Sequence, residues 1–295
     1  MSDLHRNHSK QGKNIPHRAL ELSSSSVPKG VREENNILTV PGRERGKEYE
    51  VYSPPFVSAN TPVVLFIHRS ARDCHEKKSI VSFCQNLSNI GFFVASFSCI
   101  VNDNTPLIQQ VEDIYSCINS VCERLSDTQA DKHRVHLIGE GAETIPCLYS
   151  AAIQKNPVLV DAEYSVMCNM EISSTVLING LFDLRLLLGR YKNLTRLRKE
   201  LIKSILGLNR KPINTDGSLQ LPKCLLISSK ENGRKHKSRT LAAIFKRNNI
   251  PHIQKEYQLK PQIKPYFPFV IPDSKEGHQV IAEIAAFITE FEEKY

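Results

Sequence analysis

The chain has 295 residues, of which 40 % are hydrophobic and 24 % are charged, a composition typical of a globular protein with one large domain or two small ones. No apolar run approaches the about 20 residues that a membrane-spanning helix needs, so no membrane partner is expected. The net charge of +8 could suit an acidic partner, but its densest cluster, 234-RKHKSR-239, has no interleaved aromatic side chains to stack on bases, so nucleic acid is not expected either.

The N-terminal part of the chain is polar. Residues 1–36 include a run of four serines at 23–26 and few large apolar side chains, which predicts a disordered tail. From Ile37 the pattern changes, and we expect one domain over residues 37–295. Two strand-like stretches, 37-ILTV-40 and 49-YEVY-52, flank a polar turn and predict an opening hairpin.

Strands and helices then alternate along the chain. The expected strands lie at 63–67, 92–97, 134–138, 175–178, 224–228 and 252–257, and the expected helices at about 77–90, 106–125, from 142, 183–206, 237–249 and 277–292. This alternation predicts a parallel sheet with helices on both faces, and the hairpin predicts an antiparallel edge. Ligands in such sheets bind beyond the carboxyl ends of the strands, so His68, Gly141, 179-NGLFD-183 and the loop 228–233 should surround one crevice.

The turn in 136-HLIGEGAET-144 follows a strand and precedes a helix. A strand that ends in G-x-S-x-G before a helix is where many hydrolases place a nucleophilic serine. Here the central position is Gly141, and the last glycine is replaced by Glu143. A glycine at this position is expected to supply a positive φ without strain.

Several segments carry a resemblance to a known family. They are 63-VVLFIHRSAR-72 (in place of strand-HGGxW), the acidic pair of 110-QVEDI-114, 131-DKHRVHLIGEGAET-144, 177-LINGLFDLRLLL-188 and 277-GH-278. In this order and spacing they resemble the α/β-hydrolase superfamily from about residue 50 to the end, particularly its kynurenine formamidase and small carboxylesterase branch. The resemblance implies the α/β-hydrolase fold and hydrolysis of an ester or amide by a serine, a histidine base and an acid.

The resemblance assigns each catalytic part to a position of this chain, and most positions are changed. Gly141 stands at the nucleophile position, and Asn232, with Glu231 one residue earlier, stands at the acid position. Asparagine can hydrogen-bond a histidine but cannot stabilise an imidazolium by charge. His278 matches the base histidine, although it could equally be a helix-start histidine without a catalytic role.

The oxyanion-hole positions are changed as well. Arg69 and Ser70 replace the paired glycines that let the backbone approach the substrate oxygen, and the backbone amide of Ala142 is the remaining donor. His68 is kept, and we expect it to be structural, with a hydrogen bond to loop backbone.

Concerted change at the nucleophile, the oxyanion glycines and the acid predicts a catalytically inactive protein that binds a small carbonyl ligand in the old pocket, or a protein partner. One alternative is an active esterase or formamidase-like amidase that uses His278 with a displaced nucleophile, for which the candidates are Ser70, Cys74, Ser228 and Ser229. A second alternative is an interaction module that uses the basic 234–239 surface and the N-terminal tail.

The remaining patterns point to no cofactor and no metal. The ten histidines form neither HxxxH nor HExxH, and no Cys/His cluster has ligand spacing. The eight cysteines form no CxxC and lie mostly within apolar runs, as expected of buried thiols in a reducing compartment. Since the N-terminus also lacks a secretory signal, a cytoplasmic location is predicted.

Overall fold

A computed structural model describes residues 32–38, 47–68, 74–98, 106–156, 167–180, 182, 220–229, 234–257 and 274–292. The strands are β1 (Arg32–Leu38), β2 (Lys47–Ser53), β3 (Val63–His68), β4 (Phe93–Ser98), β5 (Arg134–Glu140), β6 (Glu171–Ile178), β7 (Lys223–Ser229) and β8 (His252–Tyr257). The helices are α2 (Cys74–Ile90), α3 (Leu107–Leu125), the short 3₁₀ helix η1 (Gly141–Glu143), α4 (Thr144–Lys155), α7 (Arg234–Arg247) and α8 (Lys275–Glu292).

The strands form one sheet in the order β1-β2-β4-β3-β5-β6-β7-β8. The pairs β1–β2 and β2–β4 are antiparallel, and every other neighbouring pair is parallel. The predicted parallel sheet with an antiparallel hairpin at its edge is therefore confirmed.

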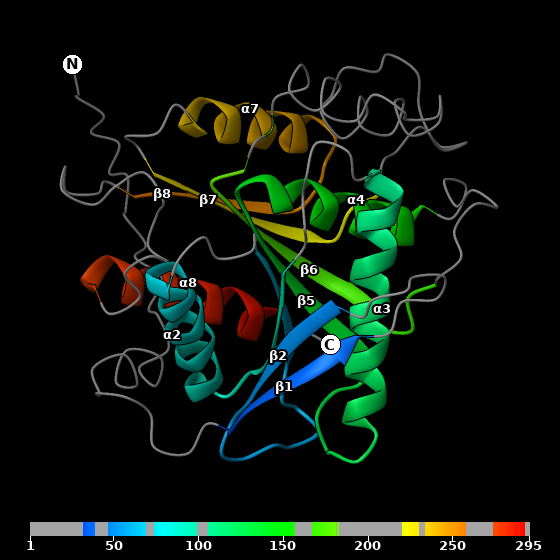
Figure 1. The fold of residues 1–295 in the computed structure, drawn as a ribbon. Helices are drawn as coiled ribbons and strands as arrows, with labels where there is room; N and C mark the ends of the chain where they lie inside the picture. Colours follow the sequence, from blue (N-terminus) through cyan, green and yellow to red (C-terminus); the bar gives the residue numbers. More distant parts are fainter. Residues whose placement is uncertain are drawn as a thin grey trace, which may run out of the picture.

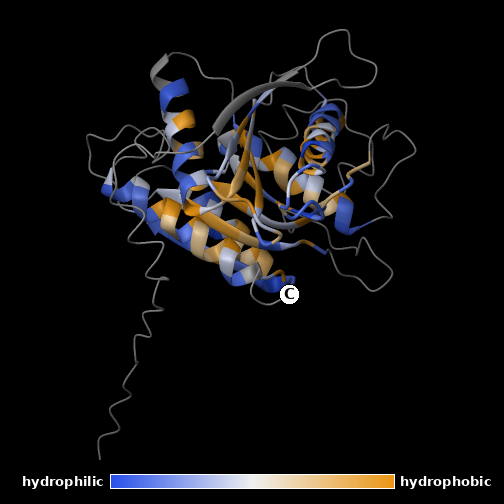
Figure 2. Ribbon diagram, turned by 90° about the horizontal axis from the view of Figure 1, so that it is seen from below, coloured by the Kyte–Doolittle hydropathy of each residue, from blue (hydrophilic) through white to orange (hydrophobic). Residues whose placement is uncertain are grey.

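Helices cover both faces of this sheet, with α3, α4 and α7 on one face and α2 and α8 on the other (Figure 1). The apolar side chains of β3 alternate between the two faces of the sheet, so both faces need a cover. Val63, Leu65 and Ile67 belong to the core on the first face, and Val64 and Phe66 belong to the core on the second. A strand buried on both faces reads as a continuous apolar run, which is how 63-VVLFI-67 appears in the sequence. Figure 2 shows the hydrophobic residues gathered where helices meet the sheet and the hydrophilic ones on the outer sides of the helices.

The first strand begins earlier than predicted. Its pairing runs from Arg32 opposite Ser53 to Leu38 opposite Lys47, so the expected strand at 37–40 is corrected to 32–38. The polar segment 32-REENN-36 pairs because it lies at the edge of the sheet, where backbone hydrogen bonding does not require apolar side chains. Otherwise the division into a tail and one domain stays a prediction.

Most other elements lie within a few residues of their predicted bounds. The helix predicted to start at 142 begins instead as η1 and continues as α4. The helical stretch predicted at 183–206 lies outside the described residues. Within the described part of the chain, no helix combines the length and apolarity required to cross a bilayer.

Candidate functional site: the turn after strand β5

The carboxyl ends of four neighbouring parallel strands lie along one edge of the sheet. Ile67 pairs with Gly139, Glu140 pairs with Ile178, and Ile178 pairs with Ile227. Of the residues predicted to surround one crevice, His68, the β5 turn, Asn179, Ser228 and Ser229 thus lie along this edge, while the crevice itself stays a prediction.

Gly141 is the centre of the turn between β5 and α4. Its φ of +61° lies in the left-handed region, which confirms the expected positive φ. The Thr144 hydroxyl donates a hydrogen bond to the Gly141 carbonyl oxygen at 2.7 Å and so closes the turn. A Cβ built on Gly141 would meet only Glu143 Oε2 within 4 Å, at 3.9 Å, so the position has room for a side chain but carries none.

Gly139 holds the last stretch of β5 against α4. A Cβ at this position would stand 2.6 Å from Cys147 Sγ and 3.0 Å from both the Glu143 carbonyl oxygen and Thr144 Cα. Two of these contacts are with backbone, which cannot move aside. The first glycine of the motif is therefore required by packing, independently of any reaction.

Glu143 places a carboxylate inside the turn. Its side chain is buried, with 2 % exposure, and it precedes the first residue of α4, where the helix dipole favours a negative charge. Its Oε2 is 3.9 Å from the Cβ position of residue 141.

His278 lies in the first turn of α8. Its amide donates to the Ser274 carbonyl oxygen at 2.9 Å, and the Gly277 amide donates to Ser274 Oγ at 3.0 Å, so Ser274 caps the helix. The placement at a helix start is as predicted, and the side chain is half-buried. Arg69, Ser70 and Asn232 lie outside the described residues, so only Gly141, Ala142 and His278 of the predicted site are placed.

His68 ends β3 with a partner that the sequence did not indicate. Its Nε2 lies 2.9 Å from Ser96 Oγ, which belongs to the neighbouring strand β4. Both side chains are buried, with 8 % and 3 % exposure, on the α2 side of the sheet. The partner that the structure identifies is thus a hydroxyl within the sheet.

Asn179 braces the end of β6 against β7, a role that sequence reasoning missed. It has a φ of +48° and 1 % exposure. The Asn179 backbone N–H donates to the Ile227 carbonyl oxygen at 2.8 Å, and the Asn179 side-chain Oδ1 accepts from the Ser229 backbone N–H at 3.1 Å. The Asn-Gly dipeptide is a turn signal in the sequence, but it does not reveal a bond to a residue fifty positions later.

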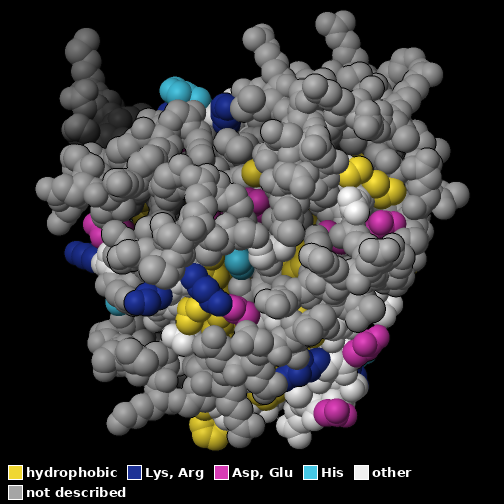
Figure 3. Space-filling model, viewed as in Figure 1, with side chains coloured by type: hydrophobic (Ala, Val, Ile, Leu, Met, Phe, Trp, Pro, Cys, Tyr) yellow, Lys and Arg dark blue, Asp and Glu magenta, His cyan; other side chains and the backbone are white. Residues whose placement is uncertain are grey.

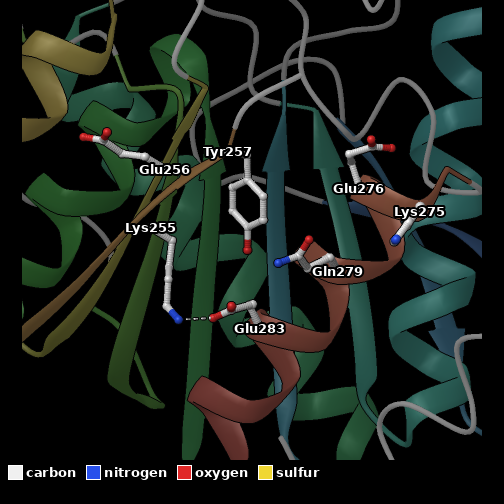
Figure 4. Close-up of a pocket in the computed structure, with 7 residues that line it drawn as sticks. All are labelled: Lys255, Glu256, Tyr257, Lys275, Glu276, Gln279 and Glu283. Atoms are coloured by element: carbon white, nitrogen blue, oxygen red, sulfur yellow. Dashed lines mark ion pairs between the residues drawn. The ribbon is translucent and has the colours of Figure 1, made fainter. Parts of the chain in front are cut away.

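A groove lies between β8 and the start of α8 (Figure 4). Its volume is about 340 Å³, and it is lined by Lys255, Glu256, Tyr257, Lys275, Glu276, Gln279 and Glu283. Lys255 Nζ and Glu283 Oε2 form an ion pair at 2.7 Å. The pKa of Tyr257 is raised, mainly by burial and to a smaller extent by the nearby charge of Glu283. The lining is polar and includes neither His278 nor a residue of the β5 turn, and nothing in the sequence indicated this groove.

Comparison with known proteins places the fold. No protein-family model matches the sequence, and no curated protein matches it. Among solved structures, esterase B from Lactobacillus rhamnosis has a TM-score of 0.72 at 17 % identity, covering 94 % of this chain and 93 % of that chain. A fungal esterase from Rhizomucor miehei has a TM-score of 0.64 at 16 % identity, covering 94 % and 89 %. An esterase from Pyrobaculum calidifontis has a TM-score of 0.59 at 16 % identity, covering 92 % and 88 %. Identities this low establish a shared fold and not a shared activity.

Proposed function

We propose that this chain, which has the α/β-hydrolase fold, has lost the serine-hydrolase reaction and acts by binding a small carbonyl ligand or a protein partner. The observation that carries this proposal is Gly141, a glycine with a φ of +61° at the position that the resemblance assigns to the nucleophile. A positive φ between a strand and a helix is compatible with the sharp turn on which hydrolases place their nucleophile, and a glycine has no side-chain atom to attack a carbonyl carbon.

The expected loss of rate is large. Removing one member of a catalytic triad typically costs on the order of 10⁴- to 10⁶-fold in rate. An ionised Glu143 would add to this loss, because a carboxylate beside residue 141 would oppose a developing oxyanion. The resemblance to kynurenine formamidases suggests a formyl amide as the class of ligand that the old pocket would accept.

A second candidate is an esterase or amidase with a displaced nucleophile, which the esterase names of the structural neighbours favour. Among the described residues, Ser96 and His68 form a hydrogen-bonded serine–histidine pair, but both are buried away from substrate. Ser228 and Ser229 each have 0 % exposure, which also keeps them from substrate.

The test is hydrolysis of p-nitrophenyl acetate and N-formylkynurenine by the purified full chain. The matched variants are His278→Ala and His133→Ala, since His133 is an exposed histidine away from the turn. We expect all three proteins to hydrolyse both compounds at the rate of buffer. Turnover that His278→Ala abolishes and His133→Ala preserves would establish the second candidate instead.

Ligand binding is measured separately, by the thermal unfolding midpoint in the presence of N-formylkynurenine. A ligand that binds only the folded chain stabilises it by about 2.7 kcal/mol at a hundred times its Kd. A saturable rise of the midpoint without product formation is the expected result. If no rise occurs, the protein-partner form of the proposal is retained and the ligand form is discarded.

A further inference from the structure

The positive charge of this chain is concentrated in one segment. The 24 residues 234–257 contain seven Lys or Arg and one acidic residue, a net charge of +6, whereas the other 271 residues together carry +2. The six-residue cluster 234–239 is therefore only part of the feature. In the fold, Lys246 and Arg247 lie on the same helix as this cluster, α7. Lys255 of β8 points to the other face of the sheet, where it pairs with Glu283 of α8.

Helix α7 presents this charge outward. Leu241, Ala242 and Phe245 are buried in the core that covers one face of the sheet. Exposed residues occupy the opposite side of the helix: His236, Arg239, Thr240, Ala243, Lys246 and Arg247. Figure 1 shows α7 as an outer helix, and Figure 3 shows histidine and Lys or Arg side chains at the surface in that part of the same view.

Helix stability explains only part of this arrangement. Lys246 and Arg247 lie in the last turn of α7, where the helix dipole favours positive charge. The first turn contains no acidic residue, although the dipole favours one there, and 234-RKHK-237 places positive charge in it instead. The acidic residue of the segment, Glu256, is engaged by Arg239 through contacts of 2.5 and 2.7 Å.

We propose that the exposed face of α7 docks on an anionic phospholipid surface. Clusters of about four to eight Lys or Arg on an amphipathic helix bind the acidic lipids of a cytoplasmic leaflet. Helix α7 contains six, and among those whose side chains are described Arg239, Lys246 and Arg247 are exposed. The face has no exposed aromatic or large apolar side chain, so it rests on the headgroups without inserting. The sequence predicted no membrane partner because it has no apolar run long enough to span a bilayer, and peripheral contact with headgroups does not need such a run.

The same face fits nucleic acid less well. Helix α7 has no Asn or Gln to pair with an adenine edge and no exposed aromatic side chain to stack on a base. A partner of α7 is thus recognised by its charge density alone, and a planar bilayer can meet both charged ends of the helix at once. Salt should reverse such contact, because charges exposed to solvent are screened over about 10 Å at about 0.1 M ionic strength.

The test is co-sedimentation of the full chain with vesicles of neutral lipid and with vesicles that contain about 30 % phosphatidylserine. The test variant is Lys246→Gln/Arg247→Gln, and the control is Lys78→Gln/Lys132→Gln, whose side chains are exposed on α2 and on the loop before β5. Both variants lose two positive charges, so a dependence on net charge alone would affect them equally. Thermal unfolding verifies that both variants are folded.

We expect the wild-type chain to bind only the anionic vesicles and to be released at about 0.5 M salt. Each Lys or Arg contributes about 5-fold to affinity at such a surface, so the α7 variant should bind roughly 25-fold more weakly while the control binds as the wild type. Equal weakening of both variants, or absence of vesicle binding, would overturn the proposal. Binding to duplex DNA but not to vesicles would assign the surface to nucleic acid instead.

Discussion

A serine at position 141 would have two effects: it would place a Cβ on a residue with a positive φ, and it would supply a hydroxyl group. A residue with a Cβ at φ +61° costs about 1–2 kcal/mol of stability, whatever its functional group. Gly141→Ala and Gly141→Ser should therefore destabilise the chain by similar amounts in urea unfolding. Gly141→Ser should restore little hydrolysis of p-nitrophenyl acetate, because Glu143, Arg69 and Asn232 are unchanged. Strong hydrolysis by the serine variant alone would mean that the rest of the site is intact.

Buried thiols give a second prediction for single residues. Burial raises the pKa of Cys224 to about 12. The Thr175 hydroxyl, which donates to the Cys224 sulfur at 3.1 Å, lowers this pKa by a smaller amount. At about pH 8.5 roughly one such thiol in a few thousand is ionised, and only the thiolate is alkylated. We expect iodoacetamide to modify the half-exposed Cys122 in the folded chain and to leave Cys224 unmodified until urea is added. Mass spectrometry of the labelled peptides measures both sites in one sample, and equal labelling in the folded chain would contradict the burial of Cys224.

Between elements, Asn179 couples the end of β6 to β7. Asn179→Gly loses the side-chain acceptor for the Ser229 amide but relieves the positive φ, whereas Asn179→Ala loses the acceptor and keeps the backbone cost. A buried donor left without its acceptor costs about 1–3 kcal/mol, and the left-handed backbone adds about 1 kcal/mol for alanine. Urea unfolding should therefore rank the chains wild type, Asn179→Gly, Asn179→Ala in falling stability. The reverse order of the two variants would show that the φ of +48° is not retained.

The elements were largely predictable because each carries its own pattern. The period of α3 and the apolar runs of β3 and β7 depend on residues that are close in sequence. The start of β1 was missed because an edge strand pairs through backbone and needs no apolar signal, as 32-REENN-36 shows. At the site, the positive φ of Gly141 could be predicted from its residue type, but the burial of Glu143 and the bond between His68 and Ser96 depend on contacts between distant segments.

On the scale of the whole molecule, α8 closes the second face of the sheet. Ile284 has 0 % exposure and belongs to a core shared with β3, β5, β6, β7 and α2. Ile284→Ala should cost about 2–5 kcal/mol, because the surrounding structure cannot fill the cavity. Gln279→Ala, an exposed position on the same helix, should change stability by less than about 0.5 kcal/mol. Chemical unfolding measures both, and a small effect at Ile284 would mean that α8 is not packed on the sheet.

The two glycines of the β5 turn should differ in mutational tolerance. A Cβ at residue 139 would stand within 3.0 Å of Cys147 Sγ and of two backbone atoms, so nearly every substitution in a saturation library should be depleted under selection for the folded chain. Residue 141 has open space and a backbone cost of similar size for most residues, with asparagine and aspartate favoured, so its substitutions should survive as one group. In related sequences that are no longer under selection for hydrolysis, residue 141 would then vary, whereas Gly139 would be retained. Packing alone would thus preserve the shape of the turn after the catalytic residue has been lost.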